Sequence, residues 1–468
     1  MAIINGRVPE PDPRFNNMAR TVVVKLKEEV ARPAPADRVA PYAESAIGEP
    51  WTDLRAQFPG LTIRPYFEAE DDVQAFGVNA ERVMASGSIE ATRYLAVDCP
   101  ADVNPLHVAS RLRESPVVQV AYPEGGPTPP PVNPSDDLRS GNQGYLDPAP
   151  GGIDARWAWI NGPADGGGAR IVDLEQGWTL DHEDLTGAGV TIISGASTAY
   201  HGHGTAVLGE IIAVDNTLGG IGIAPAASAR VVSQFRDNGA YRTADAIRSA
   251  ASAMAAGDVL LLEAQIDYPT AAGLVPVEVE ELVFDAIVAA VALGIIVVEA
   301  AANGGVDLDL FQDVNGNYVL NRNSADFRDS GAIVVGAATS AVPHRRLHFS
   351  NHGSRVDCYA WGENIDTSGD GWTGTATNAY TQGFGGTSGA SPMVAGAALI
   401  LQSWRRRQGR TPYLPPDMRR LLTDGAANTE SADPASDRLG VMPNLRAIIE
   451  QERSVMPPNV PTGVRIVR

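Results

Sequence analysis

The sequence predicts an α/β fold with a mostly parallel central sheet, preceded by a smaller α+β domain. Short apolar strands alternate with helical segments between residues 229 and 304, and this alternation is typical of parallel strands joined by right-handed crossovers. Ahead of them, residues 21–124 contain four strand-like segments and a well-capped helix. A stretch rich in proline and glycine, residues 125–150, is predicted to be a linker. The 468 residues suffice for two or three domains.

The N-terminal region begins with residues 1–20, which are rich in proline and asparagine and are expected to form a loose arm. Pro65 pushes its strand to a sheet edge, because proline cannot donate a ladder hydrogen bond. Asn104 and Pro105 provide the cap and first turn of a helix that runs to Arg113. The remaining expected elements are strands at residues 21–27, 61–67, 92–98 and 116–122, and a short helix at 51–58.

The larger region supplies the strand–helix alternation. Its expected strands lie at residues 229–233, 258–263 and 294–304, and its expected helices at 244–256 and 278–293. The last expected helix starts near residues 440–445, and a Pro-rich tail is predicted from 453 to 468.

Composition excludes some classes of partner. The formal net charge of -20 argues against nucleic acid, because phosphates would be repelled. No apolar run approaches the length of a membrane span. The two cysteines, Cys99 and Cys358, fall in different predicted domains and are expected to be free thiols. Since no signal-peptide apolar segment is present, a cytoplasmic location is expected, with secretion left open.

Ser388 is a candidate nucleophile. It lies in the segment Gly386–Pro392, which is followed by the apolar run 393–401, a predicted buried helix. Pro392 fits the first turn of that helix, which would place Ser388 just before the helix N-terminus. Free N–H groups and the helix dipole there favour negative charge on an attached acyl oxygen. The alternative is that Ser388 only caps the helix.

A second block supplies a candidate base. The segment HGTAVLG, residues 203–209, precedes the segment GTSGASP, residues 386–392. Together they resemble the histidine and serine blocks of the subtilisin-like serine peptidases. The resemblance covers about residues 150–450 and implies a doubly wound α/β catalytic domain over residues 151–452, a polypeptide substrate and no required cofactor. It also implies that His203 is the general base and Ser388 the nucleophile.

The third member of the triad departs from the family pattern. The family has an apolar strand ending in Asp-Ser/Thr-Gly, followed by His-x-Asp-Leu, and here the strand ends in the segment 173–177, DLEQG. Alignment on Gly177 and on the segment HEDL, residues 182–185, places the acid at Glu175. A carboxylate of either length can accept the Nδ1–H of the base. Asp173 lies on the same strand face, so it is either a supporting carboxylate or the acid in a shifted register.

Two further segments bear on catalysis and specificity. Asn303 is either part of a simple Asn-Gly turn or, as the resemblance implies, the amide that donates to the oxyanion. The segment Glu263, Ala264 and Gln265 replaces the family's Ser-x-Gly and is predicted to bind substrate. Glu263 either selects a basic side chain or is solvated at a strand end.

Accessory roles remain open. Residues 21–124 resemble the propeptide-like domains of the family, which assist folding and cover the cleft, or they form an unrelated accessory domain. In the first case the protein is latent until this intramolecular inhibitor is removed. His201 is a cleft-rim residue, a partner of His203 or, with it, a metal ligand. The acidic segment 307–317 is either a calcium loop or a solvated loop. A catalytically silent peptide-binding protein is the alternative to a serine endopeptidase.

Overall fold

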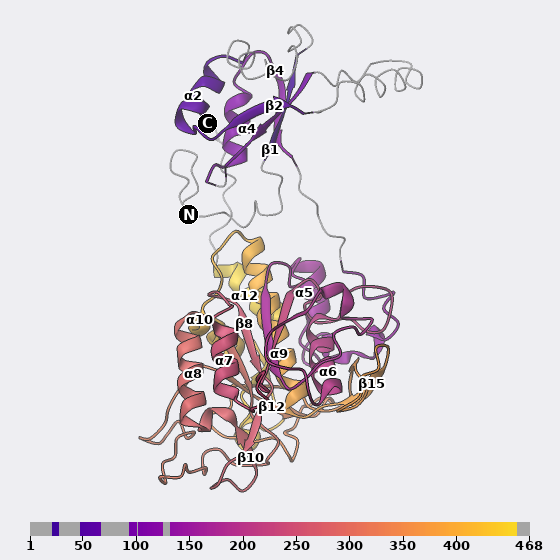
Figure 1. Ribbon diagram of the computed structural model, residues 1–468, viewed down its shortest axis with the longest axis vertical. Helices are drawn as coiled ribbons and strands as arrows, with labels where there is room; N and C mark the ends of the chain where they lie inside the picture. The colour runs from indigo at the N-terminus through magenta and orange to yellow at the C-terminus, as the bar shows by residue number, and fades with distance from the viewer. Residues whose placement is uncertain (1–20, 28–46, 67–92, 101, 125–131, 456–468) are drawn as a thin grey trace. The chain divides into compact units, whose positions relative to one another are not determined.

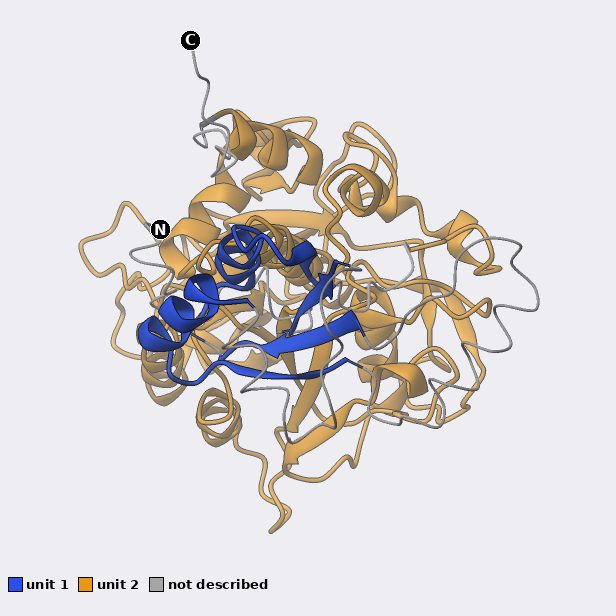
Figure 2. Cartoon of the chain, turned by 90° about the horizontal axis from the view of Figure 1, so that it is seen from above, with its two compact units in different colours: residues 1–130 blue, residues 131–468 orange. Residues whose placement is uncertain are grey.

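The computed structural model describes residues 21–27, 47–66, 93–100, 102–124 and 132–455 (Figure 1). The chain divides into two compact units, residues 1–130 and 131–468, which Figure 2 shows in different colours. The predicted arm, residues 1–20, and the tail from residue 456 lie outside the described residues.

The N-terminal unit has the predicted α+β fold. Its antiparallel sheet has the order β2-β3-β1-β4, which puts the Pro65 strand at an edge as expected. The side chain of Asn104 caps the second helix by accepting a hydrogen bond from Leu106 N at 2.9 Å. Trp51 and Leu112 are buried in the core between the helices and the sheet. The elements are β1 (Thr21–Leu26), α2 (Glu49–Gln57), β2 (Thr62–Pro65), β3 (Tyr94–Asp98), α4 (Pro105–Leu112) and β4 (Val118–Pro123).

The second unit is built on a nine-stranded sheet with the order β16-β17-β13-β12-β11-β8-β5-β7-β6. Every pair in it is parallel except β16–β17, so the predicted parallel sheet is confirmed. The strands are β5 (Arg170–Glu175), β6 (Thr191–Ser194), β7 (Ser228–Ser233), β8 (Val259–Leu262), β11 (Ile296–Ala300), β12 (Ile333–Ala338), β13 (Cys358–Trp361), β16 (Thr429–Glu430) and β17 (Val441–Met442).

Helices cover both faces of this sheet, as a doubly wound fold requires. Ile171 of β5 lies in one apolar cluster with α6 and α9, while Val172 lies in a second cluster with α7 and α8. Side chains that alternate along a strand therefore enter two separate cores. The helices are α5 (Ala155–Asn161), α6 (His201–Ile212), α7 (Thr243–Ala251), α8 (Glu281–Ala292), α9 (Thr387–Arg407), α10 (Pro415–Thr423), α11 (Pro434–Asp437) and α12 (Leu445–Val455). Two hairpins complete the unit, β9 (Gln265–Asp267) with β10 (Leu274–Pro276), and β14 (Ile365–Ser368) with β15 (Tyr380–Phe384).

Several predicted boundaries are wrong. Helix α9 begins at Thr387, so Pro392 lies inside it and Ser388 lies in its first turn rather than before it. Residues 140–146, predicted as linker, form two short 3₁₀ turns with Tyr145 and Leu146 fully buried. Helix α12 ends at Val455 and so includes the first three residues of the tail predicted from 453.

The topology places a site at one edge of the sheet. After β5 the chain adds β6 and β7 on one side, and it then crosses to add β8 and β11 on the other side. Ligands of open α/β sheets bind at such switch points, beyond the carboxyl ends of the strands. Glu175 is the last residue of β5, and Glu263 directly follows β8. Among the described helices, none has both the length and the apolar character needed to cross a membrane.

Candidate active site

One pocket of about 330 Å³ brings together the proposed triad, the Asn303 amide and the segment predicted to bind substrate, but not Asp173 or His201. Its walls also include aromatic and apolar residues that the sequence did not single out, among them Tyr200, Tyr241, Leu274 and Trp372. The predicted residues that line it are Glu175, His203, Glu263, Ala264, Gln265, Asn303 and Ser388.

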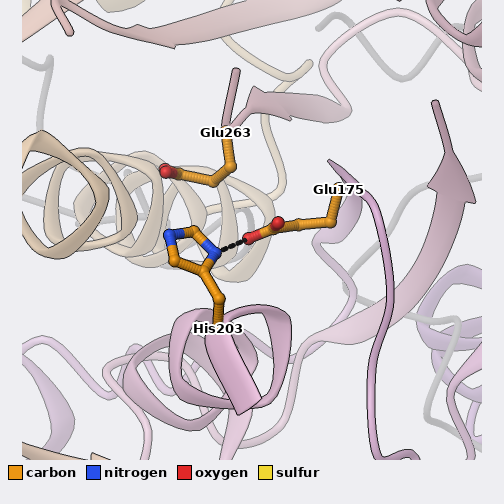
Figure 3. A group of neighbouring side chains, drawn as sticks. All are labelled: Glu175, His203 and Glu263. Atoms are coloured by element: carbon orange, nitrogen blue, oxygen red, sulfur yellow. Dashed lines mark hydrogen bonds and ion pairs between the residues drawn. The ribbon is translucent and has the colours of Figure 1, made fainter. Parts of the chain in front are cut away.

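The candidate base and the candidate acid are in direct contact. His203 is the third residue of α6, and its Nδ1 lies 2.6 Å from Oε1 of Glu175 (Figure 3). Glu175 is only 2% exposed. Burial raises the pKa of Glu175 and lowers the pKa of His203, because each charged form is poorly solvated in the interior. A neutral imidazole with its proton on Nδ1 leaves Nε2 free to accept a proton.

Aromatic rings fix the imidazole plane. The ring of Trp372 stacks on His203 with centroids 5.0 Å apart, and Phe384 meets it edge-on at 5.5 Å. The backbone N–H of His203 also donates to the Trp372 carbonyl at 3.2 Å. Trp372 lies in the connection between β14 and β15, where no periodic pattern could identify it from the sequence.

Asp173 takes a different partner. Its Oδ2 accepts a hydrogen bond from Trp178 Nε1 at 2.7 Å, and the residue is fully buried. Burial and the neighbouring charge of Glu175 raise the pKa of Asp173. The geometry therefore pairs His203 with Glu175 and leaves Asp173 behind it.

Ser388 and Asn303 meet at the start of α9. Gly386, the residue before the helix, has a φ of 81°, which a side chain would strain, and a Cβ there would lie 3.2 Å from Asn303 Oδ1. Asn303 Oδ1 accepts hydrogen bonds from Thr387 N at 2.9 Å and Thr387 Oγ1 at 3.3 Å. Asn303 Nδ2 is thereby turned toward Gln265. The hydrogen bonds of the described residues include none between Ser388 and His203.

The segment after β8 turns inward. Glu263 is 7% exposed, and its Oε1 contacts the Ser391 hydroxyl, so the prediction of a solvated strand end is wrong. Gln265 Oε1 accepts hydrogen bonds from Asn303 N at 3.0 Å and from Asn303 Nδ2 at 3.2 Å. Sequence alone did not suggest that these side chains would contact the candidate catalytic groups.

The predicted metal ligands lie elsewhere or have protein partners. The donor atoms of Glu175, His203 and Glu263 lie within 4.8 Å of one another, but the contact between His203 and Glu175 and the contact of Glu263 with Ser391 already use them. His201 does not belong to this group. In the acidic loop, Asp307 and Asp309 form ion pairs with Arg438.

A serine beside a helix N-terminus, a histidine paired with a buried carboxyl group and an amide donor, on a doubly wound sheet, define the class of the serine hydrolases. Residues 194–441 match the model of the subtilase family, Peptidase S8. This match spans His203, Asn303 and Ser388 but begins after Glu175. It covers more than half of the chain, and the chain therefore belongs to the subtilase family of serine proteases, which are hydrolases.

Relatives agree with this assignment. The chain is 29% identical over 241 residues to subtilisin DY of Bacillus licheniformis, covering 51% of this chain and 78% of that protein. It is 28% identical over 253 residues to subtilisin E of Bacillus subtilis (strain 168), covering 52% and 59%. A solved protease structure from Pseudoalteromonas arctica PAMC 21717 has a TM-score of 0.50 at 20% identity, covering 68% and 99%, and it shows the shared fold.

Proposed function

We propose that the protein is a serine endopeptidase that works through a Glu175–His203–Ser388 triad. The observation that carries the proposal is the 2.6 Å contact between His203 Nδ1 and Glu175 Oε1, in a pocket that also contains Ser388 and Asn303. Glutamate is one methylene longer than the usual aspartate, and its position at the end of β5 lets the carboxyl group reach the imidazole.

Each residue has one step in this mechanism. Ser388 Oγ bonds to the carbonyl carbon of a peptide while His203 Nε2 takes the hydroxyl proton, and Glu175 stabilises the imidazolium. Asn303 Nδ2 and the Ser388 N–H donate to the oxyanion, an interaction that contributes about 3 kcal/mol per donor. The C–N bond then breaks, His203 passes its proton to the leaving amine, and a water molecule hydrolyses the acyl-enzyme by the same steps.

The N-terminal unit keeps the enzyme latent in this proposal. Its α+β fold and its place ahead of the catalytic unit support a propeptide-like role as intramolecular inhibitor and folding aid. Cleavage in the segment 125–130 would release it. A cytoplasmic location also stays a proposal, and one relative, named an intracellular serine protease of Paenibacillus polymyxa, is 28% identical over 249 residues.

The alternative function is peptide binding without catalysis. It is favoured by Gln265, whose side-chain oxygen accepts a hydrogen bond from Asn303 Nδ2 in the resting structure. A binding protein has no use for the buried pairing of His203 with Glu175, which is the reason we prefer the peptidase.

Labelling with a fluorophosphonate probe tests the proposal on the full-length chain. We expect labelling of the wild type and no labelling of Ser388→Ala. Labelling of Glu175→Gln should be at least about a hundredfold slower, because an amide does not hold His203 in the tautomer that leaves Nε2 free to accept a proton. Asp173→Asn is the matched control and should label within a few-fold of wild type. Equal slowing by Asp173→Asn would assign the acid to Asp173 instead.

Intact mass measured during the same incubation tests latency. We expect labelling to accelerate as a fragment ending near residues 125–130 separates from the chain. Failure of the wild type to label, even after that fragment has gone, would leave the binding protein as the function.

A further inference from the structure

Glu263 is a buried carboxyl group that the proposed triad does not use. It follows β8 and extends toward the imidazole of His203, which Glu175 contacts at Nδ1 (Figure 3). The donor atoms of Glu175, His203 and Glu263 all lie within 4.8 Å of one another. Two carboxyl groups therefore lie close to the candidate base.

The contacts of Ser391 indicate which protonation state Glu263 holds. The Ser391 hydroxyl contacts Oε1 of Glu263 and lies 2.7 Å from the carbonyl oxygen of Thr387. A serine hydroxyl has one proton and can donate to only one of these oxygens. Both contacts become hydrogen bonds when Glu263 carries a proton, donates it to Ser391 Oγ, and leaves Ser391 to donate to Thr387.

The surroundings of Glu263 also disfavour its ionised form. Its Oε2 is buried and has no hydrogen-bond partner among the described residues. Three other carboxyl groups lie near it, Glu175 and Asp173 on β5 and Glu210 on α6, and only His203 and the Ser391 hydroxyl favour its ionised form. Burial and the charge of Glu175 raise the pKa of Glu263 well above that of an ordinary glutamic acid.

We propose that Glu263 is a positioning residue that must carry a proton for the peptidase to work, so that activity is lost on the alkaline side of its ionisation. The inference rests on the proposed peptidase function and deepens it. While neutral, Glu263 anchors Ser391 in the turn that carries the nucleophile, and it leaves Nε2 of His203 free to accept the Ser388 proton.

Ionisation would oppose catalysis in two ways. A Glu263 carboxylate would hold His203 as imidazolium beside two negative groups, and an imidazolium cannot accept the proton of Ser388. It would also put a negative charge in the pocket in which the oxyanion forms, where low polarity strengthens the repulsion.

The test is the pH profile of kcat/KM for an internally quenched peptide, measured between pH 5 and pH 10. Above the ionisation of Glu263 the wild type should lose about tenfold per pH unit, as a single required proton demands. Glu263→Gln, which cannot ionise, should remain within about twofold of its plateau over the same range. Glu210→Gln, a matched change of another buried carboxyl group, should keep the wild-type fall.

Two outcomes overturn the inference. One is a flat alkaline profile in the wild type, and the other is the same alkaline fall in Glu263→Gln. If Glu263→Gln is inactive throughout, infrared difference spectra decide, because at pH 7 the carbonyl band of one protonated carboxyl group should disappear in this variant. If that band does not change, the inference is wrong. If the wild type shows no Ser388-dependent probe labelling, the proposed function itself is wrong, so the two failures are distinguishable.

Discussion

At the scale of single residues, Gln265 has the most direct influence on Asn303, the proposed oxyanion donor. Its side-chain oxygen accepts from both Asn303 N and Asn303 Nδ2, so it occupies the donor that a tetrahedral intermediate would use. A substrate has to displace this oxygen before the amide can act. The contact also keeps the Asn303 amide oriented before substrate arrives, because Oδ1 is held by Thr387.

Removal of this competing acceptor should speed the reaction. A net hydrogen bond contributes about 0.5–1.5 kcal/mol, so we expect Gln265→Ala to raise kcat/KM for a short peptide by roughly twofold to tenfold. Steady-state kinetics of the two variants measures the effect. Asn303→Ala is the comparison, because loss of the donor itself should lower kcat by about 10²–10³-fold. A fall in kcat/KM for Gln265→Ala would mean that its side chain binds substrate.

The residues predicted from motifs and those that were not differ in a physical way. Sequence motifs with a fixed residue spacing predicted the backbone positions of His203, Asn303 and Ser388. The end of a predicted strand indicated Glu175. Glu263 comes one residue after a strand ends, where strict alternation of side chains no longer decides direction. Its inward orientation depends on Ser391, which lies 128 residues later in the chain.

At the scale of elements, long apolar segments were predictable and short paired ones were not. Strand β8 is a continuous apolar run, β11 is apolar except for Glu299, and both are buried on both faces, a pattern that few other elements produce. Strands β16 and β17 have two residues each, and the β9–β10 hairpin has three in each strand, so tertiary pairing alone defines them. Helix α9 was predicted, but its start was not, because Pro392 suggested a first turn that lies elsewhere.

A buried ion pair between Glu278 and Arg355 lies just before helix α8. Helix α8 was expected to start at Glu278 but starts at Glu281, because Glu278 is buried and bonds Arg355 at 2.6 and 2.8 Å. Arg355 is also fully buried and contacts Asp357 at 2.8 Å, just before β13. Loss of the guanidinium would leave buried carboxylates without a counter-charge.

We therefore expect Arg355→Met to lower the free energy of unfolding by about 3–5 kcal/mol, as the removal of one partner of a buried pair does. Urea titration of the full chain, followed by fluorescence, measures the change. Arg446→Met is the control, because Arg446 pairs with Glu450 at the surface and such pairs contribute about 0–1 kcal/mol. Equal losses in the two variants would show that Arg355 is not the anchor of this element.

At the scale of the whole molecule, the acidic composition has a counterpart inside the catalytic unit. Asp173, Glu210, Glu263 and Glu299 are buried, and burial raises the pKa of each above its ordinary value. A carboxyl group of this kind keeps its proton in the folded state at a pH where the unfolded chain has lost it. Its stabilising contribution is complete below the unfolded pKa and is lost as pH rises through the folded pKa.

Glu210 allows this pH dependence of stability to be measured at a residue that has no role in the proposed mechanism. It lies on α6, is fully buried, and neither carboxyl oxygen has a hydrogen-bond partner among the described residues. Because an unpartnered buried polar group costs about 1–3 kcal/mol, Glu210→Met should stabilise the protein by about that amount at pH 8. The gain should shrink toward pH 4, where the wild-type group is protonated in the folded and the unfolded chain alike. Chemical denaturation at several pH values measures it, with the exposed Glu450→Met as control. A gain that does not change with pH would mean that packing, and not ionisation, limits stability at this position.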